Sequence, residues 1–151
     1  MRKVIISTII VVLLMGCTKT DKYKIKKLNQ EVESFELSKI KLLDSPFKHA
    51  MEKDIQWLLD IEPDRLLHRF HKYAGIEPKD SIYHGWENDE ISGHSLGHYL
   101  SAISMAYVST DDNRVKKEFK NRVNYIVAEL SKCQDKKSSG YVGAIPGGDP
   151  Q

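Results

Sequence analysis

The stretch 91–110 constrains the fold most, because it contains no Asp, Glu, Lys or Arg. Apolar residues recur in it at helical spacing over about 93–109 and leave little polar surface on any side of the predicted helix. A helix that is apolar on nearly all sides lies inside a larger group of helices. The stretch therefore predicts an inner helix that other helices cover.

The segment that follows predicts a helix of a different kind, over about 111–135. Its apolar residues fall on one side, and charged residues that include Arg122 fall on the side that faces water. Asp111 or Asp112 can cap its first turn. An inner helix followed by an amphipathic outer helix is typical of two concentric helical layers, in which loops at one rim build a pocket. The pattern therefore favours a helical toroid.

Two shorter helices are expected upstream, over about 46–60 and 63–73. The first starts at a capping Asp44 or Ser45 that precedes a proline, and the second also starts with a proline and closes near Gly75. Proline suits the first helical turn because its missing N–H would have no intrahelical partner there. These signals predict an all-α fold.

The remaining segments are less regular. Polar and apolar residues alternate over 35–42, which indicates either a short strand or an extended lead-in. Residues 75–92 are expected to form a loop, and the end of the chain is rich in glycine.

The N-terminus resembles a bacterial export signal. Arg2 and Lys3 precede an apolar run over 4–15, which is followed by Gly16 and Cys17. The run is shorter than the roughly 20 residues of a membrane-spanning helix. The four residues that end in Cys17 resemble a lipobox, whose cysteine is lipidated. We expect residues 1–16 to be a lipoprotein signal peptide; the alternative is an ordinary signal peptide with an incidental cysteine.

Residues 17–34 are polar and rich in lysine, as in a solvated tether between a lipid and a domain. The expected product is exported and lipid-anchored to a bacterial membrane, facing the periplasm or the cell surface. Without Arg2 and Lys3, basic and acidic residues are equal in number, which argues against a nucleic-acid partner. Only Cys133 would remain as a thiol, so neither an internal disulfide nor a cysteine-rich metal site is expected.

His94 and His98 are four residues apart and share one helix face. They could ligate zinc, but a zinc site needs a third ligand, and the metalloprotease pattern would require Glu where the chain has Ser95. Gly93 and Gly97 remove bulk beside the histidines, which allows a ligand to approach closely. We favour ligand contact over structural packing, and either of these over metal binding.

Trp86 and Glu87 lie just upstream and extend the candidate site. An indole can stack on the apolar face of a sugar ring, and a carboxylate can accept hydrogen bonds from sugar hydroxyls. Alternatively, Trp86 could anchor its loop and Glu87 could be a buried general acid. Glycosidases use a pair of carboxyl groups, and the neighbouring Asp89 and Glu90 are expected to be solvated. We therefore assign no catalytic residue and predict a sugar-binding site.

The other histidines and the second cysteine receive no functional role. His49, His68, His71 and His84 are expected at the surface or its boundary, and Cys133 is expected to pack in the core.

Several short motifs in this order resemble one known family. They are LLDSPF (42–47), PDRLL (63–67), AG (74–75), GWE (85–87), GHSLGHYLSA (93–102) and GYVGA (140–144). Residues from about 35 to 150 thus resemble the N-terminal part of glycoside hydrolase family 127, the β-L-arabinofuranosidases. The resemblance implies that residues 35–151 form the N-terminal helical hairpins of an (α/α)6 toroid, part of a catalytic domain that β-sandwich domains follow.

The resemblance also implies exo-hydrolysis of β-linked L-arabinofuranose with retention. The family's nucleophile is a cysteine on a zinc ion held by further cysteines and a glutamate, and another glutamate is the acid/base. None of these matches a residue here, Cys133 included, so no cofactor is expected in this chain. Only sugar contacts carry over, onto His94 and His98, with Trp86 and Glu87 as weaker candidates.

We therefore expect a fragment that is inactive alone because the catalytic centre lies beyond residue 151. Its expected partners are an L-arabinofuranosyl or related plant-type glycan, the membrane, and a remainder of the enzyme encoded downstream. The alternative is a small helical lipoprotein that acts as a binding or scaffolding module.

Overall fold

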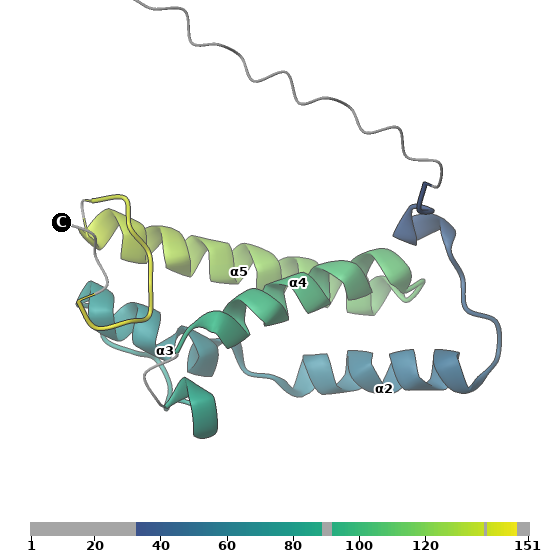
Figure 1. Ribbon diagram of the computed structural model, residues 1–151, viewed down its shortest axis with the longest axis horizontal. Helices are drawn as coiled ribbons and strands as arrows, with labels where there is room; N and C mark the ends of the chain where they lie inside the picture. Colours follow the sequence, from purple (N-terminus) through teal and green to yellow (C-terminus); the bar gives the residue numbers. More distant parts are fainter. Residues whose placement is uncertain (1–32, 89–91, 138, 148–151) are drawn as a thin grey trace, which may run out of the picture. The chain divides into compact units, whose positions relative to one another are not determined.

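The computed structural model describes residues 33–88, 92–137 and 139–147, and the chain divides into two units, Met1–Ser34 and Phe35–Gln151. The second unit contains every regular element that is described (Figure 1). These elements are η1 (Leu37–Lys39), α2 (Pro46–Asp60), α3 (Pro63–Ala74), η2 (Gly85–Glu87), α4 (His94–Ser109) and α5 (Asn113–Lys137). No strand occurs in the described ranges, and the predicted all-α fold is confirmed.

The helix ends follow the capping signals of the sequence. Ser45 is the N-cap of α2, and its hydroxyl accepts a hydrogen bond from the N–H of Lys48 at 3.3 Å. Gly75 ends α3 with φ 73°, in the left-handed region that glycine adopts without strain. Asp112 caps α5, because its Oδ1 accepts the N–H of Arg114 at 2.8 Å. The other candidate, Asp111, pairs with Lys41 instead.

Helix α5 packs against both α3 and α4, and the core lies along these contacts. The fully buried large side chains come from α3, α4 and α5; they are Phe119, Leu67, Leu96, Ile103, Ile126, His71 and Cys133. Each buried Leu, Ile or Phe contributes roughly 1.5–3 kcal/mol of transfer free energy. Cys133 packs in the core, as predicted.

Helix α4 buries one side and exposes the other. Leu96, Tyr99 and Ile103 are buried, whereas Met105 and Tyr107 are exposed. Three serines of the helix turn their hydroxyls back onto carbonyls four residues earlier, which leaves the exposed side poor in free donors. The described residues of this chain thus leave an apolar side of α4 uncovered.

Of the two alternatives for the segment 35–42, the structure shows the extended lead-in, which η1 interrupts, and its large apolar side chains are exposed. One expectation needs correction. His71, expected near the surface, is fully buried because α5 covers α3 at this point.

The predicted signal peptide, the predicted lipidation at Cys17 and the predicted tether up to residue 32 lie outside the described residues. Within the described ranges, no helix has the length and hydrophobicity that crossing a bilayer requires.

Candidate sugar-binding site

A cleft of about 460 Å³ lies where the end of α2, the turn η2 and the first half of α4 meet. Its lining is mostly apolar and aromatic. It consists of Trp57, Leu58, Ile61, Leu66, Tyr83, His84, Trp86, Glu87, Ser95, His98, Tyr99 and Ala102. The volume falls within the roughly 300–1,000 Å³ of small-molecule sites. The structure thus places three of the four predicted site residues, Trp86, Glu87 and His98, on one cleft.

The fourth residue, His94, lies beside the cleft and continues its row of rings. The His94 ring centroid is 6.0 Å from that of Trp86 and 5.9 Å from that of His98, which it meets nearly at a right angle. His94 also borders a neighbouring hollow of about 350 Å³ next to Phe70 and Tyr141. Trp86 is 70% exposed, so its indole face is accessible to a ligand.

Glu87 has a structural task that its sequence position did not reveal. Its side chain is buried, and its two carboxylate oxygens accept the N–H groups of Gly93 at 3.1 Å and Ser95 at 3.3 Å. A carboxylate here satisfies the free N–H groups of the first turn of α4 and complements the helix dipole. Glu87 Oε1 also lies 3.8 Å from His94 Nδ1. Glu87 therefore fixes the helix end that carries His94.

Arg122, which the sequence pattern predicted to face solvent, instead supports the floor of the cleft. Arg122 of α5 is partly buried and donates to the carbonyls of Leu58 at 3.2 Å, Ile61 at 2.7 Å and Leu59 at 2.8 Å. It therefore satisfies the free carbonyls at the C-terminal end of α2. Arg122 also donates to the Tyr99 hydroxyl at 2.8 Å, and burial raises the pKa of that phenol.

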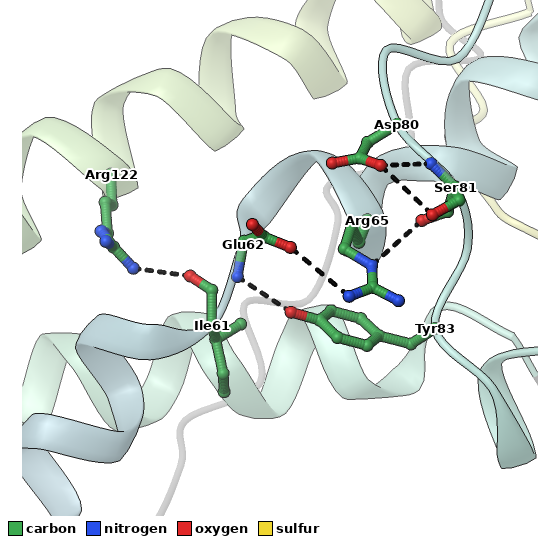
Figure 2. A network of polar contacts seen from close by, with 7 residues as sticks. All are labelled: Ile61, Glu62, Arg65, Asp80, Ser81, Tyr83 and Arg122. Atoms are coloured by element: carbon green, nitrogen blue, oxygen red, sulfur yellow. Dashed lines mark hydrogen bonds and ion pairs between the residues drawn. The ribbon is translucent and has the colours of Figure 1, made fainter.

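A second network fixes the cleft wall (Figure 2). The Tyr83 hydroxyl accepts the N–H of Glu62 at 3.0 Å, and the guanidinium of Arg65 lies 3.9 Å from the centroid of the Tyr83 ring. Arg65 also donates to the Ser81 carbonyl at 3.3 Å. The loop before η2 is thus tied to the corner between α2 and α3, which sets the positions of Tyr83 and His84 on the cleft.

The residues described do not fit the zinc centre that the resemblance implies. No three His, Cys, Asp or Glu side chains are grouped so as to hold a metal ion in the ranges that the structure covers. Cys133 is buried, and burial raises its pKa, which disfavours the thiolate that a ligand or nucleophile requires.

A buried charge cluster lies elsewhere, between α3 and α5. His71 Nε2 is 3.0 Å from Glu129 Oε2, and both side chains are almost fully buried. Glu129 also pairs with Lys79 at 3.0 Å and with Lys132 at 2.6 Å. Burial opposes ionisation of Glu129, but the hydrogen bonds from Lys132 and Lys79 outweigh it and lower its pKa to about 2. No member of this cluster lines the cleft.

Comparison with known proteins supplies the family. The sequence model described as "Beta-L-arabinofuranosidase, GH127 catalytic domain" matches residues 39–150, which include α2 to α5 and the whole cleft lining. A comparison with curated proteins finds none that matches. The family match confirms the resemblance seen in the sequence motifs. This chain belongs to the GH127 β-L-arabinofuranosidase catalytic-domain family.

Proposed function

We propose that this chain provides a sugar-binding wall of a β-L-arabinofuranosidase-type active site. The observation that carries the proposal is the row of three rings, Trp86, His94 and His98, at the edge of an apolar cleft. Family membership supports the same ligand class, because the family is described by its action on β-L-arabinofuranosides. The proposed ligand is a terminal L-arabinofuranosyl unit of a glycan.

Each residue has a distinct role in the proposal. Trp86 stacks on the apolar face of the sugar ring, and His98 exchanges hydrogen bonds with its hydroxyl groups. His94 lies at the N-terminus of α4, and its imidazole contributes further hydrogen bonds to the sugar hydroxyls. Glu87 borders the ligand and holds the helix end behind it. Apolar sites with a few placed polar groups are typical for small ligands.

The arrangement of α4 and α5 also supports the proposal. The uncovered apolar side of α4 and the amphipathic α5 suit the inner and outer layers of an (α/α)6 toroid. We propose that further helices of such a ring cover α4 and contribute the reacting groups. The described residues should then bind sugar without cleaving it.

A binding titration tests the sugar site. The full chain is titrated with methyl β-L-arabinofuranoside and followed by tryptophan fluorescence. We expect saturable binding that His98→Ala and Trp86→Ala each weaken about tenfold, while Tyr107→Ala, on α4 but outside the cleft, leaves it unchanged. Equal effects of all three variants would contradict the assignment.

Hydrolysis is tested separately with 4-nitrophenyl β-L-arabinofuranoside. We expect the purified chain to release nitrophenol no faster than the buffer does. Turnover by the zinc-free chain would show that this chain suffices for catalysis and would overturn this part of the proposal.

We also propose export and lipid attachment through Cys17, which rests on the sequence alone. Mass spectrometry of the membrane fraction should find an acylated N-terminal cysteine in cells that make the full chain. Cys17→Ala should move the protein out of that fraction; unchanged membrane retention without acylation would contradict the anchor.

A further inference from the structure

The loop that follows α3 supplies part of the cleft lining but has almost no regular structure. Tyr83, His84, Trp86 and Glu87 come from this loop and its turn η2. In the described part of the chain, the backbone of residues 77–84 makes no hydrogen bond to other backbone groups. The course of the loop therefore depends on side chains that bond to its carbonyl groups.

Two neighbouring side chains of α3 make such bonds. His68 Nδ1 lies 2.7 Å from the carbonyl oxygen of Asp80, and Arg69 Nη2 donates to the carbonyl of Asn88. A carbonyl only accepts, so Nδ1 of His68 carries the proton of its bond. The two carbonyls lie on either side of the segment 81–87, which contains the four loop residues that line the cleft.

One side of α3 faces the core and another faces this loop. Phe70 and His71 are buried, whereas His68 and Arg69 are half-buried. Arg65 lies on the same side of the helix as these two residues and donates to the carbonyl of Ser81 at 3.3 Å (Figure 2). The polar side of α3 thus holds the loop through three of its carbonyls.

The ring of Trp86 depends most on this support, because it is largely exposed and little of it is packed. Trp86 belongs to η2, and Asn88, the acceptor of Arg69, is the residue that caps this turn. The N–H of Asn88 donates to the Gly85 carbonyl at 2.9 Å. A shift of Asn88 would therefore move η2 and its indole relative to His94, whose ring centroid is 6.0 Å away.

We propose that His68 and Arg69 are positioning residues of the sugar site. Neither side chain lines the cleft. They act by holding the loop before and after its cleft-lining segment, so that Trp86 keeps its place in the row of rings. The inference rests on the proposed function for its ligand and gives a role to a histidine that the sequence pattern left without one.

Matched variants of the full chain test the inference. Arg69→Met keeps the length of the side chain and removes its donors. Lys72→Met is the control, because Lys72 is exposed on the same helix and lies over the Tyr73 ring instead of the loop. His68→Phe removes the donor at similar bulk, and His68→Asn restores an N–H near the position of Nδ1.

The first measurement requires no ligand. The chain has two tryptophans, and the indole N–H signal that Trp86→Phe removes from the NMR spectrum belongs to Trp86. Arg69→Met and His68→Phe should shift this signal, whereas Lys72→Met and His68→Asn should leave it in place. In a titration with methyl β-L-arabinofuranoside, the first two variants should bind about five- to tenfold more weakly and the other two within about twofold of the original chain.

The outcomes separate this inference from the proposed function. Circular dichroism establishes that each variant is folded at the temperature of the titration. A lower melting temperature with an unchanged Trp86 signal and unchanged affinity would show a purely structural role and overturn the inference. An equal loss of affinity in Lys72→Met and Arg69→Met would also overturn it. If the unaltered chain binds no sugar, the proposed function fails, and the Trp86 signal still decides whether His68 and Arg69 position the ring.

Discussion

Two glutamate–histidine pairs occupy opposite kinds of environment in this molecule. Glu129 and His71 are 3.0 Å apart and almost completely buried between α3 and α5. Glu87 and His94 are 3.8 Å apart, and only the glutamate is buried; the histidine side chain is 37% exposed and stands among aromatic rings beside the cleft. The same two residue types thus form a buried contact between α3 and α5, which we call the closed pair, and an accessible contact beside the cleft, which we call the open pair.

The difference lies in what satisfies each carboxylate. Two lysine ammonium groups pair with Glu129, so its charge is compensated within the fold. Backbone N–H groups at the start of α4 satisfy Glu87. A buried ion pair holds elements together, whereas a carboxylate that caps a helix can fix a histidine at the surface. This comparison suggests where stability and where binding reside.

The largest effect is expected from breaking the closed pair. Glu129→Ala leaves the fully buried His71 without its partner, and removal of one member of a buried pair costs about 3 kcal/mol. Urea unfolding at pH 7 measures the loss. Glu52→Ala, whose exposed carboxylate lies 4.0 Å from Lys48, is the control and should cost at most about 0.5 kcal/mol.

The pH dependence sharpens this test. The pKa of Glu129 is held at about 2, below its ordinary 4.5, so its stabilisation is complete above pH 4.5 and is lost as the pH falls toward 2. The difference between the original chain and Glu129→Ala should shrink over this window. A difference that stays constant from pH 5 to pH 2.5 would show that ionisation of Glu129 does not stabilise the fold.

An intermediate effect is expected at the start of α4. Gly93 has φ 96°, and an added Cβ would lie 2.7 Å from the Ala144 Cβ and 3.0 Å from the Phe70 ring. Gly93→Ala should therefore cost about 2 kcal/mol. Gly97→Ala, four residues later in open helical space, should be neutral or stabilise by about 0.5 kcal/mol. Equal melting temperatures of the two variants would show that the contact with Ala144 is unimportant.

The smallest effect is expected at the open pair. Glu87→Gln keeps an acceptor oxygen but removes the charge at the helix end, which costs about 1 kcal/mol. The NMR signals of the His94 ring should shift, and those of His71 should stay unchanged. Identical His94 signals in both proteins would mean that Glu87 does not position this imidazole.

The sequence predicted the helices well because their signals are local. Ser45 before Pro46, Gly75 after α3 and Asp112 before α5 act within one helical turn, and one turn is the range over which capping operates. Trp86 and His98, which lie within the family motifs, both line the cleft, and their contact with a sugar stays a prediction.

The missed roles depend on partners far away in the sequence. Arg122 reaches the carbonyls that end α2, and His71 meets Glu129 across two helices. Periodicity assigns a residue to a helix face but not to a partner, so it placed Arg122 in water and His71 near the surface. The spacing of Glu87 six residues before Gly93 matches no local capping pattern.

The central claim is that the cleft beside Glu87 and His94 binds an L-arabinofuranoside, whereas the buried cluster of His71 and Glu129 only supports the fold. NMR mapping of the full chain during titration with methyl β-L-arabinofuranoside tests it most directly. The account predicts saturable shifts of the Trp86 indole N–H, of the His94 and His98 rings and of the first turns of α4, with His71 and Glu129 unaffected. An unchanged spectrum at saturating sugar, or shifts centred on α3 and α5, would contradict it.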